Sequence, residues 1–378
     1  ERDRARPEAG CAIFTTSGTT KAPKLVLHSQ AAVVAHARQV ARAFGYDADD
    51  AVMLQALPLC GVFGFCQAMA SLASGRPMVL MPSFEPESAA RLVHEHRVTH
   101  SNGSDDMFQR LLAVGAGPRP FPSLRLAGFA DFNPALDDIV GQAEGRGLTL
   151  VGLYGMSEVQ ALFARQKVDA EAGQRARAGG FPVAPEAEVR VREPESGALL
   201  GPGENGELEL KGPSRMVGYY GDPQATAEAL TEDGFVRSGD LGHIASDGSF
   251  VFLSRMGDVL RLGGFLVSPA EIETFIQAHG SVDGCQVVGV TPRPGVPGGV
   301  RPVAFVTLPP GAAFDEAALK AFCANGMAGY KVPLRFVALE AFPVTTSANG
   351  TKIQRARLRQ MAATVVATIV ADARAAPA

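Results

Sequence analysis

The sequence has few cysteines and no zinc-binding motif. Its five cysteines are Cys11, Cys60, Cys66, Cys285 and Cys323, and no two of them form a C-x-x-C pair. The seven histidines contain no H-E-x-x-H motif. An odd number of widely spaced cysteines argues against a disulfide scaffold and against a zinc site. We therefore expect reduced thiols and a cytoplasmic location.

A strong net charge and an unbroken apolar run are also absent. The formal net charge of −4 gives no reason to expect nucleic-acid binding. No secretory signal pattern opens the sequence. The apolar region 52–73 comes nearest to a membrane span, but Pro58, Gly61, Gly64 and Gln67 interrupt it. We expect buried structure there instead.

The composition is that of an ordinary globular protein, with 378 residues, 46% hydrophobic and 20% charged, which suffices for two or three domains. In residues 1–177, strand-like runs alternate with helical patterns, which predicts an α/β fold with a doubly wound, mainly parallel sheet. Residues 178–256 are rich in glycine and proline and alternate apolar with polar residues, which predicts a small β-rich subdomain. Residues 257–378 predict a compact α+β C-terminal domain.

Polar chemistry is most concentrated between Phe14 and Lys24. Short apolar runs at 12–14 and 25–27 flank hydroxyl residues, a glycine and two lysines. These flanks predict a β-hairpin with a mobile loop. Hydroxyls, backbone N–H groups and cationic side chains together suit a polyphosphate, although no Walker motif can be written through the loop. A polar surface turn is the alternative interpretation.

Two acidic residues stand out further along the chain. Glu158 follows an apolar strand-like run at 148–152, and a carboxylate at such a strand end can hold Mg²⁺ together with phosphate oxygens. Asp240, in the run Ser238-Gly239-Asp240, can accept hydrogen bonds from two vicinal ribose hydroxyls. A turn with a surface carboxylate is the alternative for Glu158, and a β-turn is the alternative for Asp240.

One lysine near the end of the chain lies in a distinctive context. Lys352 follows a glycine-containing loop, 343–351, and comes just before a predicted helix. A flexible cationic side chain on such a loop can be brought to an active site and withdrawn from it. A solvated surface lysine is the alternative.

These segments, in this order, resemble the signature motifs of the adenylate-forming, or AMP-binding, superfamily, which includes acyl- and aryl-CoA synthetases, firefly luciferase and peptide-synthetase adenylation domains. The matching runs are 16–24, 154–158, 238–240, 255–273 and 343–354. Lys21 and Leu25 stand where the family usually has glycine. Family members carry a long segment before the phosphate loop, so we expect this chain to lack most of the first subdomain.

The resemblance implies a set of nucleotide-binding residues. They are Thr16, Ser17, Gly18, Thr19, Thr20, Lys24, Gly128, Ala130, Tyr154, Gly155, Met156, Ser157, Asp240 and Arg255. In the family's pattern Tyr154 stacks near adenine, Ser157 touches the α-phosphate and Glu158 is the metal ligand. Phe129 and Asp131 replace a glycine and a proline of the family's adenine wall.

The resemblance also implies a mobile C-terminal domain that acts as a lid. Gly257 and Asp258 correspond to its hinge, and Gly263 and Gly264 to the passage for the pantetheine arm of CoA. Lys352, with Glu158, is the expected catalytic residue. The motif Pro269–Glu273 starts a helix, and we interpret its role as structural.

The acyl pocket is expected around Gly61 and Phe63. Gly61 stands where acyl and aryl ligases often carry histidine, so the pocket should be wider. Val62 stands where amino-acid-activating members place an aspartate, which disfavours amino acids and favours a fatty or aromatic acid.

The implied activity is therefore ATP-dependent activation of a carboxylic acid to acyl-AMP, followed by transfer to CoA, with Mg²⁺ as the metal. The expected class is an AMP-forming acid–thiol ligase, an acyl-CoA synthetase of the kind used in fatty-acid metabolism. The glycine pair mildly favours CoA over a carrier protein as the acceptor. Two alternatives stay open: an enzyme that loads a carrier protein, and a nucleotide-binding remnant without turnover.

Overall fold

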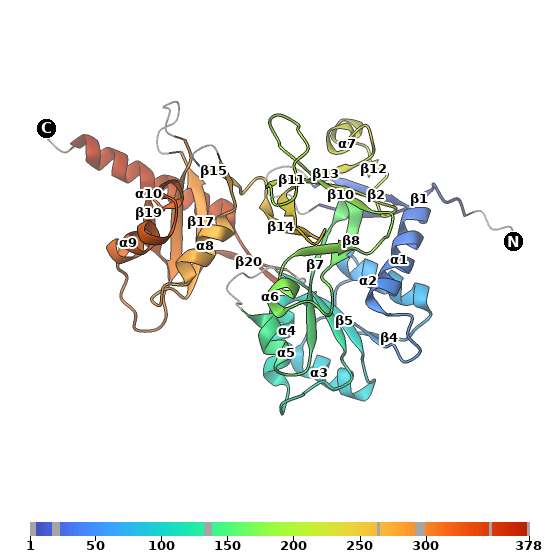
Figure 1. Ribbon diagram of the computed structural model, residues 1–378. Helices are drawn as coiled ribbons and strands as arrows, with labels where there is room; N and C mark the ends of the chain where they lie inside the picture. Colours follow the sequence, from blue (N-terminus) through green and yellow to red (C-terminus); the bar gives the residue numbers. More distant parts are fainter. Residues whose placement is uncertain are drawn as a thin grey trace. The chain divides into compact units, whose positions relative to one another are not determined.

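The computed structural model describes residues 5–16, 23–131, 138–262, 265–291, 299–347 and 350–375. They form two compact units, the first built mainly from residues up to Phe252 and the second mainly from Leu253 onward. In each unit strands and helices are mixed (Figure 1). The predicted α/β fold with a C-terminal domain is confirmed. Among the described residues, no helix combines the length and the apolar character needed to cross a membrane.

The first unit contains an eleven-stranded sheet. In spatial order its strands are β10 (Glu188–Arg192), β11 (Gly206–Lys211), β13 (Val236–Ile244), β14 (Phe250–Arg255), β9 (Gly179–Pro182), β8 (Gln160–Arg165), β7 (Thr149–Met156), β6 (Leu126–Ala130), β5 (His100–Ser104), β3 (Met53–Gln55) and β4 (Met78–Leu80). The run from β7 to β4 is parallel, whereas β8, β9, β14 and the β10–β11 pair are joined by antiparallel pairing. The strands of region 178–252 thus belong to the same sheet as the parallel strands and extend it with antiparallel pairing.

Helices cover both faces of the parallel strands, as the doubly wound prediction requires. The helices of the first unit are α1 (Gln30–Phe44), α2 (Val62–Ser74), α3 (Pro86–Glu95), α4 (Asp105–Val114), α5 (Ile139–Glu144), α6 (Ala172–Arg175) and α7 (Pro223–Ala229), and α7 packs against the small sheet described below. Met53, Leu126 and Val151 pack with α1 and α2, and their neighbours Leu54, Ala127 and Leu150 pack with α3, α4 and α5. Because successive strand residues point to opposite faces, this alternation places the two helix layers on opposite sides of the sheet.

Local sequence signals explain where the helices begin and end. The Ser29 hydroxyl accepts a hydrogen bond from Ala32 N at the start of α1, and Gly45 ends α1 in the left-handed conformation. Helix α3 starts at Pro86, because the Glu85 carboxylate accepts from the N–H groups of Glu87 and Ser88.

A small antiparallel sheet also belongs to the first unit. It joins β1 (Gly10–Thr15), β2 (Leu25–Ser29) and β12 (Gly218–Tyr219). Two residues far apart in the sequence, Val26 and Tyr219, are paired in this sheet. The 3-10 turn η1 (Ser157–Val159) links β7 to β8.

The second unit is built on a three-stranded sheet of β17 (Gly284–Val290), β18 (Arg301–Thr307) and β19 (Arg335–Ala338). Its other elements are β15 (Leu260–Leu262), β16 (Phe265–Val267), α8 (Pro269–Gln277), α9 (Glu316–Gly326), η2 (Gly329–Lys331), β20 (Val344–Ser347), β21 (Gly350–Ile353) and α10 (Arg355–Ala375). Residues of α8 and α9 pack on one set of sheet side chains, and Leu358, Ala362 and Val366 of α10 pack on the alternate set.

Two strand predictions are corrected. The strand predicted to end at Gly152 extends to Met156, because antiparallel pairing with β8 continues through Tyr154 and Met156. The β-turn considered for Ser238–Asp240 is wrong, since these residues lie within β13, where Gly239 has a φ of 67°. Pairing with distant strands decides both cases.

Candidate active site

The hairpin predicted around the polar loop is formed by β1 and β2, which pair from Gly10 opposite Ser29 to Thr15 opposite Leu25. Two hydrogen bonds close its end: Thr16 N donates to Lys24 O at 3.0 Å, and Lys24 N donates to Thr16 Oγ1 at 3.1 Å. Thr16 and Lys24 therefore fix the base of the loop. The other predicted loop residues, Ser17, Gly18, Thr19 and Thr20, lie outside the described residues.

A tyrosine that the sequence motifs did not indicate connects Lys24 to Glu158. The Lys24 Nζ lies 4.5 Å from the centroid of the Tyr219 ring, a cation–π contact. The Tyr219 hydroxyl donates to Glu158 Oε1 at 2.8 Å, and both side chains are buried. Burial, together with the neighbouring Glu158 carboxylate, raises the pKa of Tyr219, so the phenol keeps its proton. Tyr219 therefore contacts both Lys24 at the base of the loop and Glu158, the candidate metal ligand.

Glu158 is a suitable partial ligand for a hard cation. Among the described residues, no group of three or more histidine, cysteine or acidic side chains could hold a metal ion. A single carboxylate is what Mg²⁺ needs when phosphate oxygens and water complete its coordination. The donor set at Glu158 therefore fits Mg²⁺ carried in by a nucleotide.

The ends of the parallel strands β6 and β7 carry the predicted adenine-side residues. Gly128 N donates to Asn102 Oδ1 at 3.0 Å, and a Cβ on Gly128 would lie only 2.5 Å from that oxygen. Phe129 is buried in the core with α3 and α4, whereas its neighbours Gly128 and Ala130 point to the other face. The phenylalanine that departs from the family pattern is thus a core residue.

Tyr154 and Gly155 are held by protein contacts of their own. The Tyr154 ring meets Phe250 edge-on with centroids 5.1 Å apart and lies 5.8 Å from the Phe252 centroid. A Cβ on Gly155 would lie 2.7 Å from the Ala161 Cα, so the close approach of β8 requires glycine here. Met156, the last residue of β7, has its sulfur 3.9 Å from the Tyr154 hydroxyl.

The structure brings together Asp240, the predicted ribose ligand, and Arg255, another predicted nucleotide-binding residue. Arg255 Nη1 lies 2.9 Å from Asp240 Oδ1; the carboxylate is buried and the guanidinium exposed. Asp240 lies on β13 and Arg255 ends the neighbouring β14. Met256 N also donates to Gly239 O at 2.8 Å. An acidic residue held this way presents a fixed acceptor pair.

Two ion pairs within the second unit tie α10 to the predicted hinge and to the Pro269–Glu273 motif. Arg359 Nη1 lies 2.6 Å from Asp258 Oδ1. Arg355 Nη2 lies 2.9 Å from an oxygen of Glu273, which also accepts from Val287 N at 2.8 Å. These arginines were not singled out in the sequence, because a pairing between residues so far apart leaves no local pattern.

The remaining predicted residues are placed as follows. Gly61 is the residue preceding α2, and Phe63 is half-buried against the core. Gly257 accepts from Arg359 through its carbonyl at 3.4 Å. Lys352 belongs to β21, but its side chain is outside the described part of the chain, as are Gly263 and Gly264.

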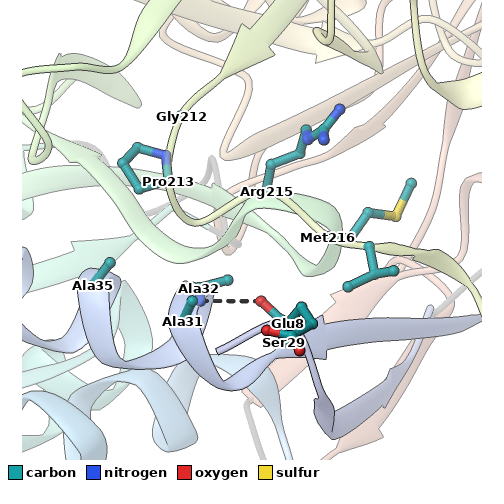
Figure 2. Close-up of a pocket in the computed structure, with 10 residues that line it drawn as sticks. Glu8, Ser29, Ala31, Ala32, Ala35, Gly212, Pro213, Arg215 and Met216 are labelled. Carbon is teal, nitrogen blue, oxygen red and sulfur yellow. Dashed lines mark hydrogen bonds between the residues drawn. The ribbon is translucent and has the colours of Figure 1, made fainter. Parts of the chain in front are cut away.

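A groove of about 470 Å³ lies elsewhere on the first unit. It runs between the start of α1 and the segment from Gly212 to Val217, and Figure 2 shows Ser29 and Ala32 on one side with Arg215 and Met216 on the other. Its lining contains none of the predicted site residues.

Two family models match this chain. The family model of AMP-binding enzymes matches residues 1–220, and the model of the AMP-binding enzyme C-terminal domain matches residues 271–349. The chain belongs to the AMP-binding enzyme family.

Its relatives include CoA ligases. The chain is 34% identical over 334 residues to a 2-succinylbenzoate–CoA ligase of Geobacillus kaustophilus, covering 88% of this chain and 66% of the relative. It is 32% identical over 349 residues to a feruloyl-CoA synthase of an Amycolatopsis species, covering 89% of this chain and 67% of the relative. The chain thus spans about two thirds of the length of these relatives, and 48% of a 4-coumarate–CoA ligase-like protein of Oryza sativa.

Solved structures share the fold. The ATP-bound MatB of Rhodopseudomonas palustris matches with a TM-score of 0.81 and 27% identity over 94% of this chain and 68% of that chain. The amide bond synthetase McbA of Marinactinospora thermotolerans matches with a TM-score of 0.80 and 28% identity, over 95% of this chain and 71% of that chain.

Proposed function

We propose that this chain carries the adenylating machinery of a CoA ligase that activates a carboxylic acid with ATP. The observation that carries the proposal is the continuous chain of contacts from Lys24 through Tyr219 to the buried Glu158. It puts one cation and one carboxylate at the base of a hydroxyl-rich hairpin. Membership of the AMP-binding enzyme family and relatives named as CoA ligases support it.

In the first reaction, a carboxylate oxygen of the acid attacks the α-phosphorus of ATP. The bond from the α-phosphorus to the bridging oxygen of the β-phosphate breaks, and pyrophosphate leaves with that electron pair. The product is acyl-AMP. No protein side chain has to act as a covalent nucleophile, because alignment of the two reactants and neutralisation of the phosphate charge lower the barrier.

The first unit supplies the phosphate-side groups. Thr16 and Lys24 hold the loop that surrounds the β- and γ-phosphates, and Ser157 lies beside Glu158 to meet the α-phosphate. Mg²⁺ held by Glu158 would neutralise part of the negative charge on the triphosphate. The Tyr219 hydroxyl keeps the Glu158 carboxylate oriented, because it donates a hydrogen bond to one carboxylate oxygen.

Nucleoside contacts are assigned to two other groups of residues. Asp240, with Arg255, accepts the ribose hydroxyls. Gly128, Ala130, Tyr154, Gly155 and Met156 form the adenine side.

The second unit is proposed to supply Lys352 and the lid motion. Lys352 neutralises charge where the carboxylate meets the α-phosphate in the first reaction. Rotation about Gly257 and Asp258 then brings CoA past Gly263 and Gly264. The CoA thiol loses its proton to solvent, and its sulfur attacks the acyl carbon. The bond from that carbon to the phosphate oxygen then breaks, and AMP leaves.

The proposed substrate is a fatty or aromatic acid that enters beside Gly61 and Phe63. Two relatives are named for aromatic acids, ferulate and 2-succinylbenzoate, which favours the aromatic class. The second candidate function is transfer of the acyl group to an amine instead of CoA. The structural likeness to a protein named as an amide bond synthetase favours it.

Exchange of labelled pyrophosphate into ATP tests the proposal. We expect exchange that depends on an added carboxylic acid from a panel of fatty and aromatic acids. CoA, a pantetheinylated carrier protein and a simple amine, supplied separately, then identify the acceptor. A folded chain that binds ATP but shows no acid-dependent exchange would rule out the proposed activity and favour a nucleotide-binding remnant.

A further inference from the structure

The segment that follows the candidate metal ligand is conformationally strained. Among the described residues, four that are not glycine have positive φ, and two of them, Gln160 (65°) and Leu162 (64°), lie two and four residues after Glu158. Gln160 combines this φ with a ψ of 153°, a region that side-chain-bearing residues rarely adopt. A strained backbone conformation persists only where surrounding contacts stabilise it. The contacts of the segment Ser157–Leu162 therefore show which residues stabilise it here.

Besides the Tyr219 hydroxyl on Glu158, several hydrogen bonds hold this segment, and two of them come from buried histidines. His28 Nε2 lies 2.7 Å from Ser157 O, and His36 Nε2 lies 2.6 Å from Ala161 O. Between them, Met216 N donates to Glu158 O at 2.8 Å. The Gln160 side-chain amide donates to Ala32 O at 3.2 Å and to Ser214 O at 3.4 Å. Every contact is within the first unit.

The two histidines are neutral and share one tautomer. A carbonyl oxygen only accepts, so the proton of each ring must be on Nε2. Both rings are buried, and neither Nδ1 has a hydrogen-bond partner among the described residues. A second ring proton would bury an unpaired N–H. In agreement, burial lowers the pKa of His28, and it lowers that of His36 to about 4.

The histidines also come from the elements that carry the phosphate loop. His28 lies on β2, the strand that leaves the loop at Lys24, and His36 lies on α1, which follows β2 directly. The phosphate hairpin and the Glu158 segment are therefore joined by two separate contacts. Tyr219 joins Lys24 to the Glu158 carboxylate, and His28 joins β2 to the backbone beside it.

We propose that His28 and His36 are positioning residues, neutral imidazoles that hold the strained segment Ser157–Leu162 so that Ser157 and Glu158 face the triphosphate and its metal ion. This inference rests on the proposed function. His28 donates to the carbonyl of Ser157, and His36 donates to the carbonyl of Ala161, between the two strained residues Gln160 and Leu162. Loss of either donor lets the strained backbone of this segment relax, and the Glu158 carboxylate is then no longer oriented toward the metal ion.

The test compares donor-retaining with donor-lacking variants of the full chain. His28→Leu and His36→Leu remove the donor at similar volume, whereas His28→Gln and His36→Gln retain an N–H near the position of Nε2. His100→Leu is the matched control, because His100 is a buried histidine on β5 that contacts Thr99 and not this segment. The readouts are Mg·ATP affinity by calorimetry, the Mg²⁺ concentration at half-saturation, and KM and kcat for pyrophosphate exchange.

We expect His28→Leu to raise the half-saturating Mg²⁺ concentration about tenfold or more, as loss of a residue behind a metal ligand does. His28→Gln should recover most of that loss, and ATP affinity in the absence of Mg²⁺ should change little. His100→Leu should keep the wild-type Mg²⁺ dependence. Wild-type Mg²⁺ dependence in both folded leucine variants would overturn the inference.

A second measurement needs neither catalysis nor a variant that folds. Long-range ¹H–¹⁵N spectra of the wild-type imidazoles should show neutral Nε2–H tautomers for His28 and His36, and an Nδ1–H tautomer at both would overturn the inference. Wild-type protein that binds Mg·ATP but exchanges no pyrophosphate would refute the proposed function alone, since the Mg²⁺ affinities of the variants would still decide the role of the histidines.

Discussion

At the scale of single residues, the site depends on side chains that touch the predicted ligands. Glu158 and Lys24 were predicted from their motifs, but Tyr219, which contacts both, was not. Tyr219 lies in a two-residue strand, too short to show any periodicity. Its importance comes from the pairing of β12 with β2, which no local signal reports.

Removal of the Tyr219 hydroxyl should weaken nucleotide binding more than turnover. Tyr219→Phe keeps the ring beneath Lys24 but leaves Glu158 Oε1 without its donor. We expect KM for Mg·ATP to rise by roughly 10- to 150-fold, the equivalent of about 1.5–3 kcal/mol for a hydrogen bond to a charged group, and kcat to change less. Tyr220→Phe is the control, because Tyr220 is the next residue along the chain and is 62% exposed. Equal KM values for the two variants would exclude the role given to Tyr219.

Buried histidines should make the protein less stable in mild acid. Burial lowers the pKa values of His36 and His100 to about 4 from the ordinary 6.5. Between these values the unfolded chain binds protons that the folded chain does not, so stability is lost as pH falls from 6.5 towards 4.

Each of these histidines contributes at most about 1.4 kcal/mol per pH unit to that loss. Urea midpoints measured across this window should fall with pH in the wild type and fall less steeply in His36→Leu. Parallel slopes for the two proteins would show that His36 is not the source.

At the scale of elements, sequence patterns predicted helices better than strand ends. Helix α1 starts and stops where Ser29 and Gly45 indicate, because caps act locally. Strand β7 runs past Gly152, where the predicted strand ended, and β13 contains Ser238–Asp240, for which a β-turn was the alternative, because neighbouring strands supply the pairing. The Pro269–Glu273 motif was correctly given a helix start, and the structure adds that Glu273 is buried against Arg355 of α10.

The Arg355–Glu273 pair should stabilise the second unit. Glu273 is 1% exposed, and burial raises its pKa even though Arg355 acts to lower it. Arg355→Ala leaves this carboxylate without its cation and should cost about 3 kcal/mol of unfolding free energy, measured by urea denaturation. Arg357→Ala, at an exposed position on the same helix, should cost far less. A midpoint equal to that of Arg357→Ala would mean that the pair contributes no stability.

At the scale of the whole molecule, alternating strands and helices predicted the doubly wound sheet, and the packing of alternate strand residues with different helix layers explains why. The sequence did not predict that the strands of region 178–252 extend this sheet, because that depends on the pairing of β14 with β9 and of β9 with β8. The proposed domain boundaries at 178 and 257, and the hinge at Gly257–Asp258, remain predictions.

The division of labour between the two units predicts separate effects on the two reactions. Lys352→Ala should reduce formation of acyl-AMP by at least about 100-fold, because a preorganised charge at the α-phosphate is lost. Formation of thioester from supplied acyl-AMP and CoA should stay within about 3-fold of wild type, since the lysine has no part in that step. Rapid-quench measurement of each half-reaction checks this. Equal losses in both would contradict the assignment of Lys352.

Transfer of ¹⁸O from the acid to AMP tests the central chemical claim most directly. The acid identified in the exchange screen, labelled in its carboxylate, is incubated with ATP, Mg²⁺ and CoA, and the AMP is analysed by mass spectrometry. Attack by a carboxylate oxygen on the α-phosphorus predicts one ¹⁸O atom in each AMP, because the acyl carbon–oxygen bond breaks in the second step. Unlabelled AMP, or release of ADP in its place, would contradict the account.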